Sequence, residues 1–226
     1  MRFREEYRRS QIGPFYRGYA HFTFTSIASL SVIGFAISRV HAPTWRELLT
    51  VPVSFVIANA AEYFGHRGPM HRPRAGMRLL FQRHTREHHH FYTHDAMSYE
   101  SSRDFKMVLF PPVMLFFFLG MLATPVGLLL YEAASPNCGW IFVAVAMSYF
   151  LTYEWLHFTY HLSPDSMAGG SPIFRALRKH HQNHHDKSLM GKYNFNITFP
   201  ICDLVMGTIY RGTPALKPAA RLAQDK

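Results

Sequence analysis

Long uncharged runs alternate with short polar segments along the chain, and the runs have the length of membrane-spanning helices. A helix needs about 20 apolar residues to cross the roughly 30 Å hydrocarbon core of a bilayer. Three runs without Asp, Glu, Lys or Arg meet this length, and a fourth reaches it when Trp45 and Tyr63 anchor its ends at the interfaces. The predicted spans are residues 19–38, 48–61, 107–131 and 133–153.

The third run contains four residues that disrupt helices, namely Pro111, Pro112, Gly120 and Pro125. They predict either one kinked span or a span followed by a re-entrant piece. The whole pattern therefore predicts an all-α integral membrane protein with about four transmembrane helices.

The composition agrees with a membrane protein. Charged residues make up 17% of the chain, against about 25% in soluble proteins. Disorder, collagen and a disulfide-stapled secreted domain are excluded, and Cys138 and Cys202 form no recognisable metal or redox pair. The 226 residues predict a single membrane-embedded domain over 1–226, with a basic N-terminus at 1–18 and a C-terminal tail at 209–226.

The charge distribution predicts an orientation. The net charge is +10, and 22 of the 24 basic residues fall within residues 1–18, 65–106 and 161–226. Four spans with both termini inside place these three segments on the cytoplasmic side, as the positive-inside rule requires. Topology and attraction to anionic lipids explain the basicity, so no nucleic-acid partner is expected. The expected location is a bacterial inner membrane, or the endoplasmic reticulum of a eukaryote, as a multi-pass protein.

Most of the 15 histidines fall in four clusters that are suited to metal binding. The clusters read HRGPMH at 66–71, HTREHHH at 84–90, HFTYH at 157–161 and HHQNHH at 180–185. Neutral imidazole ligates iron and zinc, and a pair at i and i+4 aims both rings from one helix face at one ion. All four clusters lie at the cytoplasmic ends of predicted spans or in cytoplasmic segments. They therefore predict a His-rich helical cap that holds one shared metal centre.

The angular positions of the histidines on a helix predict which members of the second cluster bind metal. On a helix that advances 100° per residue, His88 lies about 40° from His84, so the two share a face. His89 would then reach a second ion from the flank, whereas His90 points away. We predict that His84 and His88 are ligands and that His90 is not.

The first cluster has a less regular spacing. His66 and His71 lie five residues apart, which is poor on a regular helix. Gly68 and Pro69 between them would end the helix and let His71 fold back.

The number of imidazoles predicts two ions. Ten candidate rings exceed the four to six ligands that one ion takes, and five nitrogens would leave an octahedral ion one open position, which indicates catalysis. Iron, zinc, manganese and copper all fit these ligands. A metal transporter would need ligands near the bilayer midplane, where the span interiors hold essentially none. A zinc metallohydrolase would need only about three ligands and a carboxylate base, which leaves most of the histidines unexplained.

The four clusters and the segment KYNFNITFPICDLVMGT at 192–208 together resemble the fatty acid hydroxylase/sterol desaturase superfamily. The resemblance covers residues 63–208. The segments YEWLHFTYH at 153–161 and HQNHH at 181–185 are closest to its fatty acid 2-hydroxylase branch. The second cluster departs from that branch, because it reads His-x3-His-His where His-x2-His-His is usual.

The resemblance implies an oxidoreductase, a membrane-bound non-haem di-iron monooxygenase that hydroxylates a fatty acyl chain or a sphingolipid acyl group. Two iron ions would be the cofactors, with zinc able to replace them on isolation, and O2 would be the co-substrate. A separate electron donor of ferredoxin or cytochrome type would supply two electrons. Sterol or carotenoid hydroxylation and desaturation are the alternatives within the superfamily. The implied metal ligands are His66, His71, His84, His88, His89, His157, His161, His181, His184 and His185.

Polar residues beside these motifs are candidates to accept the second ring N–H of a ligating histidine. They are Glu62, Glu87, Glu154, Asp186, Asn194 and Asp203.

Overall fold

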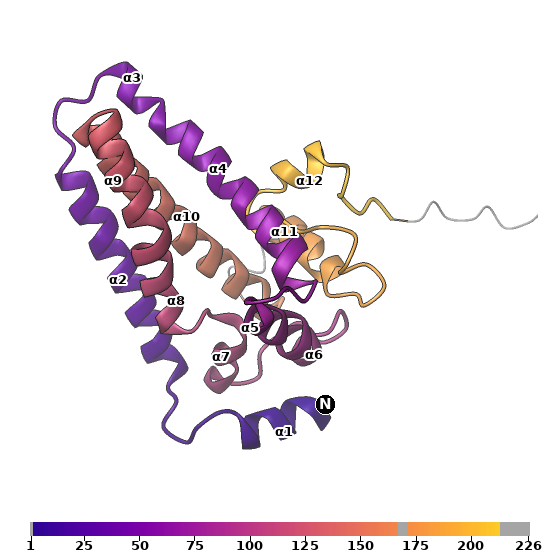
Figure 1. The fold of residues 1–226 in the computed structure, drawn as a ribbon. Coiled ribbons are helices and arrows are strands. Elements are labelled where there is room, and N and C mark those ends of the chain that lie inside the picture. Colours follow the sequence, from indigo (N-terminus) through magenta and orange to yellow (C-terminus); the bar gives the residue numbers. More distant parts are fainter. Residues whose placement is uncertain (1, 167–170, 213–226) are drawn as a thin grey trace, which may run out of the picture.

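The computed structural model describes residues 2–166 and 171–212, and every regular element within these two ranges is helical. Figure 1 shows a bundle of long helices with a cap of short helices packed around one end. Most of the predicted C-terminal tail, residues 213–226, lies outside the described part of the chain.

Four helical segments of the described chain are long and apolar enough to cross a membrane, which confirms the predicted number of spans. The first is α2 (Gly18–Ser38) and the last is α10 (Pro136–Tyr160). The second span runs through α3 (Trp45–Leu48), α4 (Thr50–Gly65) and the π-helical η1 (His66–Met70).

The third span confirms the predicted irregularity. After a break at Leu109–Pro111, α8 (Pro112–Phe117) continues through the π-helical η4 (Phe118–Ala123) into α9 (Thr124–Ala133). Pro112 occupies the first position of α8, where a missing N–H costs no helical hydrogen bond. The prolines therefore start the helix after the break, and α8, η4 and α9 form the apolar, irregular span within the segment Ser102–Ala133.

Helix α10 is the central helix of the bundle and packs against α2, α4 and α9. Buried side chains of α10, including Val143, Met147 and Phe150, form an apolar core with Ala36 of α2 and Leu115 of α8. Large apolar side chains elsewhere on the spans, such as Ile27, Val53, Phe116 and Leu129, are exposed. A water-soluble protein rarely exposes such a belt, whereas lipid tails would cover it.

The cap gathers short helices from the whole length of the chain. It contains α1 (Arg2–Ser10), α5 (Arg78–Phe81), the π-helical η2 (Gln82–His88), α6 (His89–Phe91), the 3-10 helix η3 (Ser102–Asp104), α7 (Phe105–Val108), α11 (Pro172–His184) and α12 (Ile201–Val205). Helices α4 and α10 both end at the cap, so the histidines that follow them enter it directly.

Candidate metal centre

Two groups of histidine side chains converge inside the cap. In each group the ring nitrogens of different residues lie within 4.8 Å of one another, which is close enough to hold a metal ion. The first group is His66, His71, His84, His89 and His184, and the second is His88, His157, His161 and His181. All four predicted clusters therefore meet, although they lie up to about 120 residues apart in the sequence.

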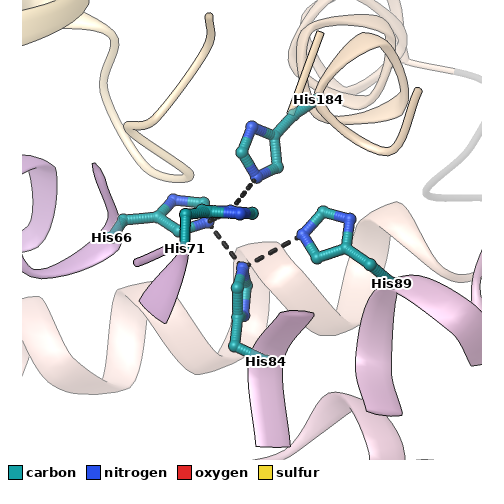
Figure 2. Close-up of side chains that lie close together, drawn as sticks. All are labelled: His66, His71, His84, His89 and His184. Carbon is teal, nitrogen blue, oxygen red and sulfur yellow. Dashed lines mark hydrogen bonds between the residues drawn. The ribbon is translucent and has the colours of Figure 1, made fainter. Parts of the chain in front are cut away.

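The first group is drawn in Figure 2, where five rings from three parts of the chain point toward one another. The Nε2 atom of His66 lies 2.7 Å from that of His84 and 3.2 Å from that of His71. The Nε2 atom of His71 lies 2.8 Å from that of His184, and His89 lies 3.1 Å from His84 in the same way. Nitrogens on a common ion at about 2.1 Å would be spaced by roughly 3 Å, so the separations fit one ion.

One π-helical turn brings two rings of this first group together. His84 and His89 lie five residues apart at the end of η2, and their Nε2 atoms are neighbours because a π-helix pairs residues at i and i+5. The predicted pairing of His84 with His88 on one ion is therefore wrong. Their rings stack with centroids 5.4 Å apart, but His88 belongs to the second group. The cause is the helix period, which is π rather than α across this cluster.

The predicted reversal after His66 is confirmed. The backbone leaves helical geometry at Gly68, where φ is −88° and ψ is −106°, and Pro69 follows. The chain then turns so that the ring of His71 lies 4.9 Å from that of His66. Two histidines five residues apart, His66 and His71, therefore lie side by side here as well.

The second group is buried, and all its members except His88, the last residue of η2, come from α10, α11 or the residue that follows α10. His157 follows the i and i+4 rule with His161, and its Nε2 lies 3.2 Å from that of His88. His181 reaches His161 with 3.3 Å between Nε2 atoms. We add His185 to the second group, because its Nε2 lies 3.0 Å from that of His181 and 3.2 Å from that of His88. Its ring also stacks on His89 with centroids 4.3 Å apart, so the two groups adjoin.

Backbone carbonyls orient five of the ten rings. In the second group, the Nδ1 atom of His88 lies 2.7 Å from the Met107 carbonyl oxygen, that of His161 lies 2.7 Å from the Met97 oxygen, and that of His185 lies 2.5 Å from the Tyr92 oxygen. In the first group, the Nδ1 atom of His184 lies 3.0 Å from the Tyr193 carbonyl oxygen, and that of His66 faces the Phe195 oxygen. A carbonyl can only accept, so Nδ1 carries the proton in each of these rings and the lone pair lies on Nε2. Five Nε2 lone pairs are thereby aimed into the two groups.

These carbonyls carry no signal in the sequence, because any residue type supplies one. The six polar side chains predicted to accept a ring N–H bond other groups instead. Glu62 accepts from Tyr149, Ile197 and Thr198; Glu87 from Tyr7 and Arg83; Glu154 from the Phe110 amide; and Asp186 from Ser188. Asn194 donates to the His180 carbonyl, and Asp203 accepts from Phe195, Asn196 and Thr208.

Two of these carboxylates support the proposed metal ligands indirectly, through the backbone. Asp203 binds the amide of Phe195 at 2.9 Å, and the carbonyl of the same residue faces His66. Glu62 binds the amide of Thr198 at 3.0 Å, three residues further along. Together they fix the segment 193–198, which supplies the carbonyls for His66 and His184.

Burial keeps the cap imidazoles neutral. It lowers the pKa of His88 to about 4 and that of His71 to about 2, in the second case with repulsion from neighbouring rings. Burial likewise holds the pKa values of His84, His89, His161, His181, His184 and His185 well below the usual range. A metal ion requires the neutral form, so the rings are ready to bind near pH 7.

Two histidines of the clusters lie outside both groups. His90 is exposed and its Nδ1 faces the Thr85 carbonyl at 3.2 Å, which agrees with its predicted exclusion. His180 lies with its Nε2 3.4 Å from Asp203. All ten predicted ligands are therefore brought together, and these two neighbours are not.

The donor set suits two ions that accept nitrogen ligands. It offers neutral imidazoles with fixed tautomers, and no carboxylate belongs to either group among the described residues. Magnesium and calcium prefer oxygen ligands and would fit poorly. The fold and site together define a helical protein with four candidate membrane spans and with histidines at one end of its bundle that could hold metal ions.

Comparison with known proteins identifies the family. The profile of the family "Fatty acid hydroxylase" matches residues 51–208, about two thirds of the chain, so the chain belongs to this family. A solved structure titled "Full length scs7p (only hydroxylase domain visible)" is similar in fold, with a TM-score of 0.59 and 20% sequence identity over 86% of this chain and 67% of that one. No curated protein sequence matches the chain significantly.

Proposed function

We propose that the chain is a di-iron oxygenase that hydroxylates the acyl chain of a membrane lipid. Membership of the fatty acid hydroxylase family supports a lipid hydroxylase. The observation that carries the proposal is the presence of two adjoining imidazole groups, each large enough for one ion. Ion one would be held by His66, His71, His84, His89 and His184, and ion two by His88, His157, His161, His181 and His185.

Two iron ions would supply the redox chemistry that divides O2 between the product and water. One oxygen atom enters a C–H bond of the lipid, and the other leaves as water after taking up two electrons and two protons. The protein holds the ligand rings in one tautomer and keeps bulk water away. His88, His161, His181 and His185 are each at most 3% exposed, so the second group is well shielded from solvent.

An aromatic column links this site to the membrane-spanning bundle. Phe118 packs on Phe150, and Phe110 stacks on Tyr153 with ring centroids 5.2 Å apart. Tyr153 in turn lies 5.6 Å from the ring of His157. An apolar substrate that enters from the bilayer would meet these rings, whereas a water-soluble one would not, and this favours a lipid.

The electrons would come from a separate donor on the cap side, which we assign to the cytoplasm by the positive-inside rule. Six basic residues near the centre give this side its charge and would attract an acidic ferredoxin or cytochrome-type protein. They are Arg72, Arg74, Arg78, Arg175, Arg178 and Lys179, of which all but Arg178 are exposed.

Lipid profiling of a host that expresses the chain tests the proposal, with the His88→Ala variant as the inactive control. We expect acyl chains that have gained one oxygen atom in cells with the wild-type chain and none in the control. Products that have instead lost two hydrogens would show desaturation, and oxygen found only on sterols or carotenoids would exclude an acyl substrate.

A further inference from the structure

The N-terminal helix α1 carries a buried arginine, Arg4, that contacts the loop whose carbonyls orient two of the proposed ligands. Arg4 is only 4% exposed although it lies in a short terminal helix of mostly exposed residues. Burying a guanidinium is costly unless its donors are paired. The partners of Arg4 therefore show what the helix is attached to.

Those partners are backbone carbonyls at the end of α6 and in the loop between α6 and η3. Arg4 donates from Nε to Phe91 at 2.6 Å, from one terminal nitrogen to Ser98 at 3.1 Å, and from the other to Ala96. Its guanidinium also lies 5.1 Å from the ring centre of Tyr92, a distance at which cation–π attraction acts.

The bound carbonyls alternate with the ones that orient the proposed ligands. Phe91 precedes Tyr92, whose carbonyl faces His185, and Ala96 and Ser98 flank Met97, whose carbonyl faces His161. Successive carbonyls of an extended loop point in different directions, so one side of the loop can bind Arg4 while the other binds the histidines. Arg4 thus fixes both ends of the segment 92–97.

A second anchor holds α1 in place. Arg8 donates to both carboxylate oxygens of Asp104 at 2.7 Å, and Asp104 is completely buried. Glu100 pairs with Arg4 at 2.9 Å and with Arg8 at 2.8 Å. The bidentate geometry fixes the position as well as the charge of the helix.

We propose that Arg4 is a positioning residue for the second ion, acting through the Tyr92 and Met97 carbonyls on His185 and His161. The proposal rests on the proposed function, since it needs ions in both groups. Helix α1 lies outside residues 51–208 that match the family, so this contact is a feature of the chain beyond the matched region.

The test uses the full-length chain loaded with iron under anaerobic conditions, and follows release of each ion to a chelator. Removing a group that bonds a metal ligand directly typically weakens metal affinity by 10- to 100-fold. Arg4 acts through neighbouring carbonyls, so its effect belongs at the lower end of this range. We expect Arg4→Met to speed release of one ion by about tenfold and to leave the other unchanged. Arg9→Met is the matched control, because Arg9 lies exposed on the same helix, and it should change neither ion.

The conservative variant Arg4→Lys keeps one cation and loses the forked contacts, so it should produce a smaller change in the same ion. If Arg4→Met does not fold, the release rates of Arg4→Lys test the proposal in its place. Wild-type release rates for both ions in the two Arg4 variants, with only a lower unfolding temperature, would overturn the proposal and show a purely structural contact. A wild-type chain that binds a single ion would instead refute the proposed function before any variant is compared.

Discussion

The two imidazole groups hold similar rings but are built on different backbones. The first depends on five-residue spacings, His66 with His71 and His84 with His89, which a break at Gly68 and a π-helical turn bring together. The second uses the four-residue spacing of α-helix in His157 with His161. The first also contains His71, which is only partly buried, whereas every member of the second is buried. Irregular backbone therefore brings together the two pairs of the first group, whereas the second group relies on regular helix apart from His88, which ends the π-helical η2.

Both groups use main-chain carbonyls as ring supports, for His66 and His184 in the first group as well as in the second, but the first group also uses a side chain. In the second group His88 and His161 face main-chain carbonyls. In the first group His71 instead lies 3.2 Å from the hydroxyl of Thr85, which donates to the Met70 carbonyl at 2.6 Å. A hydroxyl can accept from the ring while it donates elsewhere. The support of His71 can therefore be removed by a side-chain mutation, whereas the carbonyls that face His88, His161 and His185 cannot.

The largest expected effect separates adjacent histidines. His88→Ala removes a buried ring from the second group and should lose that ion and all activity. His90→Ala removes an exposed ring that belongs to neither group and should keep both ions and most activity. Metal analysis of the two variants side by side measures the difference. Loss of an ion in His90→Ala with His88→Ala intact would mean that the helix phase is misassigned.

A smaller effect is expected at the support of the first group. Thr85→Val keeps the side-chain shape but removes the hydroxyl between His71 and Met70, at a cost of about 1 kcal/mol in stability. It should speed chelation of the first ion and spare the second, the reverse of Arg4→Met. Thr159→Val is the control, since that hydroxyl bonds only within its own helix, to Trp155. Faster release of the second ion would contradict the division into two groups.

The smallest effect is a pH dependence of the metal-free protein. The pKa of His88 is about 4 in the folded chain and about 6.5 when it is exposed by unfolding. The unfolded chain therefore binds more protons, so the unfolding temperature should fall as the pH drops from about 6.5 toward 4. His88→Ala should reduce this fall, whereas His94→Ala, which alters a partly exposed ring, should not. Equal pH dependence in all three proteins would argue against burial of His88.

Local patterns in the sequence predict the spans and the four histidine clusters, whereas the choice of ten ligands among the twelve clustered histidines rests on the resemblance to the family. Uncharged runs of about 20 residues can satisfy their backbone only as helices in a membrane. The pairing of His84 with His89 could not be predicted, since a π-helical turn has no clear signature in residue type. The same holds for the carbonyls of Tyr92, Met97 and Phe195, which are set by tertiary folding. The buried Arg4 looked like one more member of a basic N-terminus.

Metal stoichiometry tests the central claim most directly. The chain, purified after anaerobic expression in iron-rich medium, should hold two ions per molecule, and His88→Ala should hold one. Zinc in place of iron would leave the count at two, because the same imidazoles bind it well. A value of one ion or fewer in the wild-type chain, with its helical fold intact, would contradict a centre made of two imidazole groups.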